Sequence, residues 1–323
     1  MVSKYLLSYK KPEMFGILSA CAFICLCLTV FTYLAPLWWV FDLCCHFHLQ
    51  YAICFMLFLA VSIVKKKYLF VGPAAILIVT NLFPVVSLYA NPENILANEN
   101  KTTFSVMMLN VEAKNTGYQK AIQTIKEIDP DILLLEEFTH EWRANTKELN
   151  GLFPYSFGSP QIDCSGNMMY SKYPLEDMEI KAAGLYERPT LVSKVLIKGR
   201  KINIVGTHPV PPIGRERAEL RNGHLLDVAR ITSELNGSIV LLGDFNTTPF
   251  SNLFKMIVKI SGLNDSMQGY GPQLSWPAWY LPINPFLIPI DHCLVSKDIK
   301  VLDRTIGPYA GSDHYPLILQ LAI

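Results

Sequence analysis

Three long apolar segments occupy the first ninety residues of the chain, at positions 14–34, 47–64 and 68–90. A helix needs about 20 apolar residues to cross the hydrocarbon layer of a membrane, and each segment approaches or exceeds that length. A cleaved signal peptide has a shorter apolar core, of about 7–15 residues, and a buried helix of a soluble domain usually keeps a polar face. The pattern therefore predicts a membrane anchor of about three transmembrane helices within residues 1–90.

The lysines around these segments predict an orientation. Lys4, Lys10 and Lys11 precede the first segment, and a run at 65–67 separates the second from the third. The connection between the first two segments has no Lys or Arg. Because basic residues remain on the cytoplasmic side, we expect an integral membrane protein with a cytoplasmic amino terminus. Everything after Ala90 then lies on the non-cytoplasmic (periplasmic or extracellular) side.

The polarity of the chain changes after the third segment. Residues 91–101 are polar, contain Pro92 and read as a linker, and residues 102–323 have the mixed polarity of a soluble domain. Short apolar runs there alternate with polar, helix-like stretches. We expect helices at 118–128, 215–235 and 251–260, and strands at 104–109, 132–135, 167–170, 191–197, 202–206, 239–242, 290–295 and 317–321.

Strands outnumber helices in this pattern, and some adjacent runs read as hairpins, such as 191–197 and 202–206 joined through Gly199. This order favours two packed sheets with helices outside over a single parallel sheet. The expected fold class is an α/β (α+β) four-layer sandwich of two mixed β-sheets flanked by helices, preceded by the transmembrane helices.

Of the eight cysteines, six lie in the membrane part, where a thiol behaves as a small apolar group. Cys164 and Cys293 are the two in the polar domain. In an oxidising compartment they could form a disulfide, but the sequence does not indicate that they are close.

Polar side chains recur at one end of the expected strands, where sites gather in α/β folds. Alone, each has an ordinary explanation: a solvated charge, a helix cap, or an Asx turn in the case of GDFN. Such residues recur at the ends of six expected strands, and this recurrence indicates a site. We call these six groups of residues the stations: Asn110 and Glu112, Glu136 and Glu137, Thr207 and His208, Asp244 and Asn246, Asp291, and Asp313 and His314.

The stretches that contain these residues resemble the endonuclease/exonuclease/phosphatase superfamily of metal-dependent phosphoesterases. The resemblance covers about Thr103 to Ile323 and rests on PDILLLEE, GNMMYSKYPL, GDFN, IDHCLVS and SDHYP. Glu136 stands where the family usually has Gln, which leaves Glu137 aligned with the family's metal-binding Glu. The membrane segments resemble no family that we recognise.

The resemblance implies a role for each station. Glu137 would be the chief metal ligand, supported by Asn110, Glu112 and Asp313. His314, oriented by Asp291, would contact the phosphate or act as acid or base, and Asp244 would orient or deprotonate the attacking water. Asn246 and His208 would stabilise the pentacoordinate phosphorus. Such oxygen-rich sites suit Mg²⁺ or Mn²⁺, and a bound cation neutralises charge and activates water.

Three further residues are candidates for substrate binding. Asn167 matches the family's strand Asn and is equally consistent with a strand-end cap. Arg188 is equally consistent with a phosphate ligand and with a surface ion pair. Arg221 follows Arg215 and Arg217 on an expected helix, where exposure to solvent is the more usual fate of an arginine. We expect His224 and His292 to be structural.

Two kinds of phosphoesterase fit this pattern. Residues 102–323 carry 21 Lys and Arg against 23 Asp and Glu, a formal net charge of −2. DNA-binding proteins usually present a basic face, so a lipid or small-molecule phosphodiester or phosphomonoester is favoured over DNA or RNA. The apolar, aromatic stretch Trp276–Pro289, which contains Trp279, is equally consistent with lipid contact and with a lid packed on its own domain. An inactive binding module is disfavoured because every expected residue type is present, and no particular protein partner is indicated.

Overall fold

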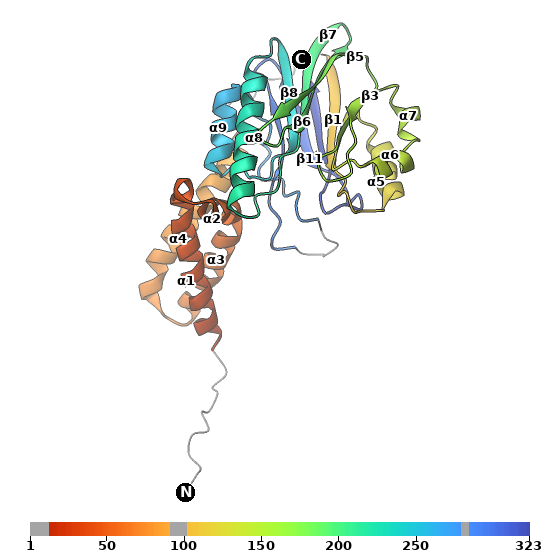
Figure 1. Ribbon diagram of the computed structural model, residues 1–323. Coiled ribbons are helices and arrows are strands. Elements are labelled where there is room, and N and C mark those ends of the chain that lie inside the picture. The colour runs from red at the N-terminus through yellow and green to blue at the C-terminus, as the bar shows by residue number, and fades with distance from the viewer. Residues whose placement is uncertain (1–12, 91–101, 279–283) are drawn as a thin grey trace. The chain divides into compact units, whose positions relative to one another are not determined.

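A computed structural model describes residues 13–90, 102–278 and 284–323, which form two compact units divided between Val85 and Val86. We call them the helical unit and the sheet unit. The linker expected at 91–101 lies outside the described residues, and the limits that we expected for the two domains remain a prediction. Figure 1 shows the helices of the first unit and the strands and helices of the second.

Residues 13–90 contain three helical stretches that are long and apolar enough to cross a membrane: Met14–Tyr33, Trp39–Val64 and Tyr68–Tyr89. They agree with the three predicted segments, and the second extends forward through the short helix α2 (Trp39–Cys44). The elements are α1 (Met14–Tyr33), η1 (Ala35–Leu37), α2, η2 (Cys45–Phe47), α3 (His48–Val64), η3 (Tyr68–Phe70) and α4 (Val71–Val86), and η4 (Ser87–Tyr89) follows them.

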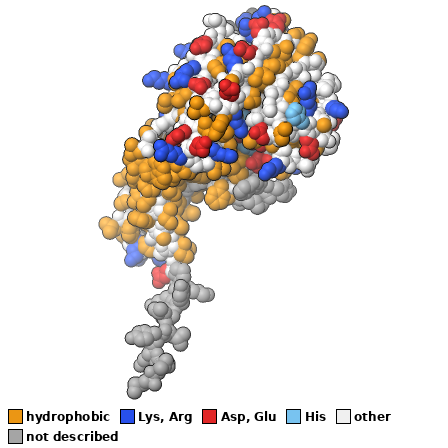
Figure 2. Space-filling model, viewed as in Figure 1, with side chains coloured by type: hydrophobic (Ala, Val, Ile, Leu, Met, Phe, Trp, Pro, Cys, Tyr) orange, Lys and Arg blue, Asp and Glu red, His pale blue; other side chains and the backbone are white. Residues whose placement is uncertain are grey.

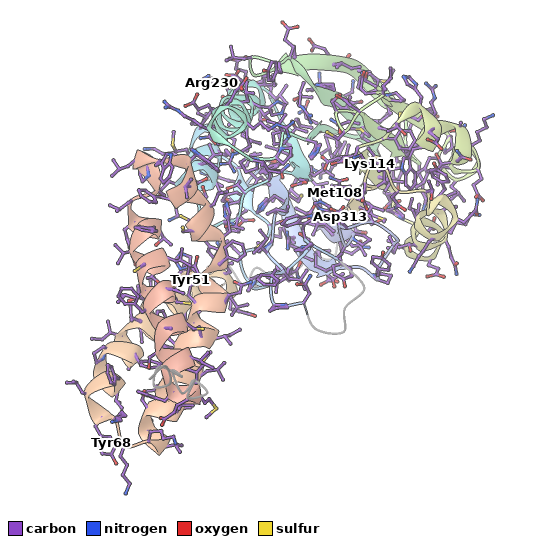
Figure 3. All side chains as sticks on the ribbon, turned by 60° about the horizontal axis from the view of Figure 1, so that its bottom comes forward. Tyr51, Tyr68, Met108, Lys114, Arg230 and Asp313 are labelled. Carbon is purple, nitrogen blue, oxygen red and sulfur yellow. The ribbon has the colours of Figure 1, made fainter. Side chains whose placement is uncertain are left out.

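Hydrophobic side chains cover most of the helical unit's visible surface (Figure 2), and its small core contains Phe55 and Tyr51, which is labelled in Figure 3. Asn81 links the three long helices. Its Nδ2 donates to Thr29 Oγ1 at 3.2 Å, and its Oδ1 lies 2.9 Å from His48 Nδ1. Polar contacts of this kind hold helices together where lipid supplies no hydrophobic driving force between them.

The sheet unit contains two mixed six-stranded sheets, ordered β11-β12-β1-β2-β4-β3 and β5-β6-β7-β8-β10-β9. Pairs β1–β2 and β7–β8 are parallel, and the remaining pairs are antiparallel. The strands are β1 (Thr103–Asn110), β2 (Ile132–Glu136), β3 (Tyr155–Ser159), β4 (Asn167–Ser171), β5 (Leu175–Ala183), β6 (Arg188–Ile197), β7 (Arg200–Thr207), β8 (Ser238–Asp244), β9 (Asn264–Asp265), β10 (Asp291–Val295), β11 (Lys300–Ile306) and β12 (Leu317–Ala322).

Helices cover the outer face of each sheet, which confirms the four-layer sandwich (Figure 1). The helices α5 (Tyr118–Ile128), α6 (His140–Asn145) and α7 (Leu149–Leu152) pack on the first sheet, and α8 (Arg215–Ser233) and α9 (Asn252–Ser261) pack on the second. A third core, which includes Met108 (labelled in Figure 3), fills the space between the sheets. Strand side chains alternate between these cores because successive residues of a strand face opposite ways.

Every predicted strand and helix of the sheet unit is present, with ends shifted by a few residues. In the predicted hairpin, Lys198 and Gly199 form a two-residue turn between the paired residues Ile197 and Arg200, and both turn residues have positive φ. The pattern missed α6, α7 and four strands: β3, β5, β9 and β11. Each missed strand lies at the edge of its sheet.

Candidate active site

The register of the strands brings the predicted stations to one end of both sheets. Asn110 pairs with Glu136 across parallel β1 and β2, and Glu136 pairs with Asn167 at the start of β4. In the second sheet Asp244, the last residue of β8, pairs with Asp291, the first residue of β10. We call this the site end of the sheet unit. Asp313, which follows β11 and precedes β12, is labelled in Figure 3.

Asp244 links the two sheets at the centre of the site end. Its backbone N–H donates to Glu136 Oε2 at 2.9 Å, and its Oδ2 lies 3.4 Å from Asn110 Nδ2. Its side chain is buried between two histidines, with Oδ2 3.7 Å from His208 Nδ1 and 3.6 Å from His314 Nε2. Burial raises the pKa of Asp244 to about 6 despite the opposing effect of His314.

His314 lies between two carboxylates. Its Nδ1 is 3.1 Å and 3.0 Å from the two carboxylate oxygens of Asp291, while its Nε2 faces Asp244. Burial alone would lower the pKa of His314, but the charges of Asp291 and Asp244 outweigh it and raise this pKa to about 10. The imidazole is therefore protonated near neutral pH and can donate a hydrogen bond from Nε2.

His208 connects Asp244 with Glu137. Its Nε2 is 3.4 Å from Glu137 Oε1. Burial opposes protonation of His208, but the close contact with the Glu137 carboxylate and the charge of Asp244 raise its pKa to about 9. For Glu137, burial raises the pKa, whereas His208 and the Ala113 N–H stabilise the carboxylate and bring the pKa down to about 2. Glu137 is thus ionised over the whole neutral range.

Further carboxylates lie near the pair formed by His208 and Glu137. Burial raises the pKa of Glu112, and the nearby charges of Asp313 and Glu137 raise it further. Glu137 accepts from Ala113 N at 3.0 Å and from Asn110 Nδ2 at 3.3 Å, so its carboxylate is held in place. The carboxylates of Glu112, Glu137 and Asp313 and the amide of Asn110 are hard oxygen donors of the kind that Mg²⁺ or Mn²⁺ prefers, so the chemistry of this donor set suits a divalent metal.

A separate group of potential metal donors lies beside these residues. The donor atoms of Asp244, Asp291 and His314 lie within 4.8 Å of one another. Both oxygens of Asp291 lie against His314 Nδ1, so this carboxylate and this imidazole are hydrogen-bonded to each other in the described structure.

Three site residues have left-handed backbone conformations, which are uncommon for residues other than Gly. The φ angles are 60° at Glu112, 55° at Glu137 and 50° at Asn246. Strained conformations of this kind tend to gather at functional sites. Their occurrence at three predicted stations supports the choice of these residues.

Arg221 is buried rather than exposed to solvent. Its Nη1 donates to the backbone oxygen of Asn246 at 2.6 Å, and its Nε donates to Asn222 Oδ1 at 2.7 Å. Asn246 also receives support from Asp244, whose Oδ1 accepts from the Asn246 N–H at 2.8 Å. Arg221 thus fixes the turn that presents Asn246.

The other two substrate-binding candidates also lie at the site end. Asn167 is fully buried and its Nδ2 donates to Pro189 O at 3.0 Å, while its Oδ1 has no hydrogen-bond partner in the described structure. Arg188 is half-buried, and its Nη1 donates to the carbonyls of Cys164 and His208 at 3.4 and 3.3 Å. Arg188 therefore joins two loops of the site end.

Glu136 occupies the position where the family usually has Gln. It is fully buried beneath the site, and burial raises the pKa of its carboxyl well above the usual value. The raised pKa favours the uncharged carboxyl, which has the shape of a glutamine amide.

Three residues that support the site were not anticipated from the sequence. Ser312, in the GSDHYP stretch, donates to Asn110 O at 2.6 Å and accepts from His314 N at 3.1 Å. Trp276 Nε1 donates to Asp313 Oδ2 at 3.0 Å, and Arg304 Nη2 donates to Asp291 O at 3.2 Å. A Ser two residues before a site His was the one available signal; the Trp and Arg contacts depend on tertiary packing.

Several other residues were considered in the sequence analysis. Trp276 packs on the site of its own unit, whereas Trp279 lies outside the described residues. His224 Nε2 lies 2.7 Å from Thr207 Oγ1, and His292 Nε2 lies 2.8 Å from Thr247 O, both buried. Cys164 and Cys293 are free thiols, with Cys293 deep in the core between the sheets.

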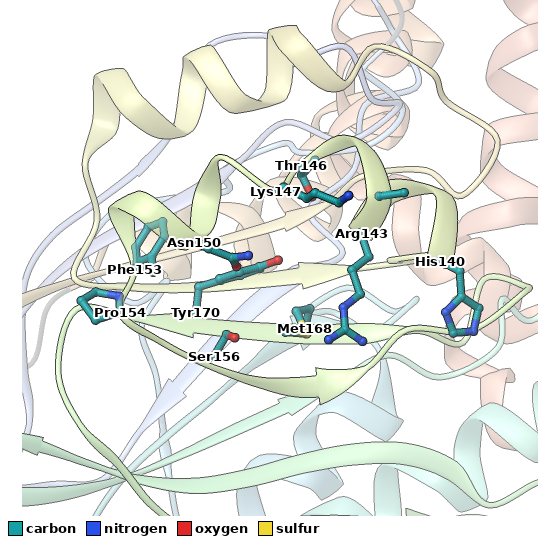
Figure 4. A pocket seen from close by; sticks show the side chains of 11 residues that line it. His140, Arg143, Thr146, Lys147, Asn150, Phe153, Pro154, Ser156, Met168 and Tyr170 are labelled. Atoms are coloured by element: carbon teal, nitrogen blue, oxygen red, sulfur yellow. The ribbon is translucent and has the colours of Figure 1, made fainter.

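A pocket of about 530 Å³ lies elsewhere, beneath α6 and α7 (Figure 4). His140, Arg143 and Lys147 line one side, and Met168 and Tyr170 of β4 line the other. Met168 faces the outer core of its sheet, on the opposite side from Met169. None of the predicted site residues lines this pocket, so its size does not identify the reaction centre.

Solved structures with the same fold are similar to the sheet unit. Truncated Caenorhabditis elegans TDP2 matches with a TM-score of 0.55 and 18% identity over 68% of this chain and 98% of that chain. D. rerio TDP2 complexed with single strand DNA product gives 0.58 and 15% over 68% and 99%. The human Nocturnin catalytic domain gives 0.53 and 19% over 68% and 94%. At these identities the likeness establishes the fold alone.

A sequence search among curated proteins finds no match. A family model, in contrast, matches residues 107–314, which contain every predicted metal, catalytic and substrate-binding station. The matched model is that of the endonuclease/exonuclease/phosphatase family, whose members include hydrolases of phosphoester bonds. With its two-sheet sandwich and its matched site segments, this chain belongs to the endonuclease/exonuclease/phosphatase family.

Proposed function

We propose that this protein is a membrane-anchored, divalent-metal-dependent hydrolase of phosphate esters. The observation that carries the proposal is the arrangement of Asp291, His314 and Asp244 beside the carboxylates around Glu137. Phosphoester hydrolysis needs a positioned water, donors to the phosphoryl oxygens and neutralisation of negative charge. This arrangement offers groups for each of these tasks.

In this proposal Glu137 is the chief metal ligand, and Asn110, Glu112 and Asp313 complete or support its shell. Mg²⁺, or Mn²⁺ in its place, suits these oxygen donors. When bound, such an ion neutralises phosphate charge and lowers the pKa of a coordinated water. The contacts of Glu137 with Ala113 N and Asn110 Nδ2 keep its carboxylate oriented for this role.

Asp244 is the proposed base. With a pKa of about 6 it is mostly ionised at neutral pH and still close enough to that pH to accept a proton from the attacking water. His314, protonated and held by Asp291, donates from Nε2 to a phosphoryl oxygen. His208 and the side-chain amide of Asn246 supply further donors as charge develops on the pentacoordinate phosphorus.

Asn167 and Arg188 are proposed to contact the substrate phosphate. Both lie at the site end beside Thr190 and Thr207, whose hydroxyls are 3.1 Å apart. For Arg221, the third candidate, we propose a positioning role, which its buried hydrogen bond to Asn246 O supports.

A lipid or another small phosphoester is the favoured substrate, whether diester or monoester. In Figure 2 basic and acidic side chains are interspersed over the visible face of the sheet unit, and its formal charge from residue 102 onward is negative. Nucleic-acid binding relies on phosphate neutralisation by a basic surface, so these features support a smaller substrate. We also keep the predicted orientation as part of the proposal, with the site on the non-cytoplasmic side.

The test uses the full chain in detergent with Mg²⁺ and compares it with Asp244→Asn. The substrates are phospholipid vesicles, inositol phosphates, a soluble chromogenic phosphodiester, and single- and double-stranded DNA. The proposal predicts cleavage of a lipid or small ester that is lost with EDTA and in the variant. Cleavage of DNA alone would replace this proposal with a nuclease, and turnover that survives both treatments would contradict the assigned centre.

A further inference from the structure

Five large apolar side chains protrude from loops at the site end of the sheet unit. Ile162, Leu185 and Ile213 are 93%, 90% and 75% exposed, and Tyr186 and Phe286 are also mostly exposed. We call these five residues the apolar rim. Exposing such groups to water is unfavourable by roughly 25 cal/mol per Å² of apolar surface, so a cluster of them calls for an explanation.

Strand register places each of these loops at the site end. Residues 160–166 connect β3 to β4, whose first residue is Asn167, and residues 184–187 connect β5 to β6. Residues 208–214 follow Thr207 at the end of β7, and Phe286 lies shortly before Asp291 at the start of β10. Every loop of the rim is therefore adjacent in sequence to a predicted site residue.

Hydrogen bonds join three of these loops into one surface. Arg188 donates to Cys164 O in the first loop and to His208 O in the third, and it directly follows the second loop in sequence. Tyr186 Oη also donates to Glu216 Oε1 at 3.0 Å, which ties the second loop to the start of α8 next to Ile213. Ile162, Leu185 and Ile213 are thus carried by loops that are fixed relative to one another.

The rest of the sheet unit from residue 102 shows no comparable feature among its described residues. Its other exposed large apolar side chains are Tyr155, Met178, Ile180, Met256 and Leu302, and the most exposed of these, Met178, reaches 51%. Single exposed apolar residues are normal on soluble proteins, whereas a group gathered around a site marks an interaction surface.

We propose that the apolar rim inserts into the interfacial layer of a lipid bilayer, so that the site receives the phosphate of a phospholipid headgroup from the membrane. The chain itself indicates a bilayer as the partner, because three of its helices are long and apolar enough to cross one. Apolar side chains on loops gain free energy when they leave water for the acyl boundary. Exposed Arg217, close to the rim on α8, would then meet the lipid phosphates.

This inference rests on the proposed hydrolysis and names its substrate class. It is tested first without any turnover, with the full chain in phospholipid nanodiscs. A photoreactive benzoylphenylalanine replaces Leu185 or Ile213, and Met256 on α9 is replaced in the same way as a matched control. We expect lipid cross-links from positions 185 and 213 at least fivefold above those from 256. Equal cross-linking at all three positions, or links from 185 and 213 to a second protein copy instead of lipid, would overturn the proposal.

Kinetics in the same nanodiscs separate this inference from the proposed function. We expect the double variant Leu185→Ser, Ile213→Ser to lose at least tenfold in hydrolysis of disc phospholipid and less than twofold in hydrolysis of a soluble chromogenic phosphodiester. The matched control, Met178→Ser with Met256→Ser, should keep both activities. An equal loss on both substrates would contradict the rim's role while leaving hydrolysis intact as a function. If the wild type hydrolyses neither substrate, the proposed function fails, and the cross-linking result decides alone whether the rim meets the bilayer.

Discussion

His314 Nδ1 lies 3.0 Å from Asp291 Oδ2, and both side chains are buried at the boundary between the two sheets. The pair joins the loop before β12 in the first sheet to the first residue of β10 in the second. A carboxylate in this position fixes the imidazole's orientation and favours its charged form. His314 is therefore held in its protonated, hydrogen-bond-donating form only when both sheets are assembled.

Asp291→Asn should shift the pH dependence of hydrolysis. Asn keeps the shape and an acceptor for Nδ1–H but removes the charge that, with Asp244, raises the pKa of His314 to about 10. This pKa then falls, and the protonated, active form of His314 is lost as pH rises from neutral. We expect kcat/KM to drop about tenfold or more near pH 8 and much less near pH 6.

The measurement is kcat/KM between pH 5.5 and 9 for the two proteins on a soluble phosphodiester. Asp303→Asn, a change of an exposed residue on β11, serves as the control and should leave the profile unchanged. A uniform loss at every pH in Asp291→Asn would contradict the role given to the charge.

Arg221→Lys separates positioning from substrate binding. Lys keeps the positive charge but has no guanidinium to donate from both Nε and Nη1, so the Asn246 turn loses support. We expect kcat to fall about tenfold with KM nearly unchanged. Arg230→Lys, a change of an exposed residue farther along α8, is the matched control. A rise in KM at constant kcat would instead make Arg221 a substrate ligand.

His224 should make the protein sensitive to acid. Burial lowers the pKa of His224 to about 4, although its contact with Ala183 O acts the other way. The unfolded state binds a proton at His224 near pH 6.5, whereas the folded state binds it only near pH 4. Protonation therefore favours unfolding as the pH falls from 6.5 toward 4, and this destabilisation is absent above pH 6.5. The difference between the two pKa values corresponds to about 3 kcal/mol of unfolding free energy.

The Tm of the full chain in detergent should consequently fall between pH 7 and pH 4.5, and the fall should be smaller in His224→Gln. His140→Gln, a change of an exposed histidine, should follow the wild type. Identical pH slopes in wild type and His224→Gln would show that another group controls acid stability.

Burial explains which parts of the fold the sequence predicted. Central strands such as β1 and β8 are buried on both faces and appear as continuous apolar runs. The missed β5 and β11 lie at sheet edges, with largely exposed residues and several charges. An edge strand pairs on one side only and needs no apolar run, so its sequence resembles a loop.

The residues of the site also fall into those that the sequence could predict and those that it could not. Glu137, Asp244 and His314 could be predicted because each follows or precedes a recognisable strand in a family motif. The burial of Glu136 and Arg221 could not, because it depends on contacts with residues more than 20 positions away, Asp244 and Asn246. Of the apolar rim, the sequence indicated only Phe286, which lies in the apolar stretch Trp276–Pro289. The other four residues are scattered from position 162 to 213, and only the strand register gathers them.

The neighbouring residues Glu136 and Glu137 provide the most direct test of the central claim that a divalent metal at this centre drives phosphoester hydrolysis. The measurement is hydrolysis of a soluble phosphodiester by the full chain as a function of Mg²⁺ concentration, for the wild type, Glu136→Gln and Glu137→Gln. We predict no turnover in EDTA, near wild-type activity for Glu136→Gln, and a loss of at least a hundredfold for Glu137→Gln with a higher Mg²⁺ requirement. Turnover that ignores Mg²⁺, or Glu137→Gln acting like the wild type, would contradict the account.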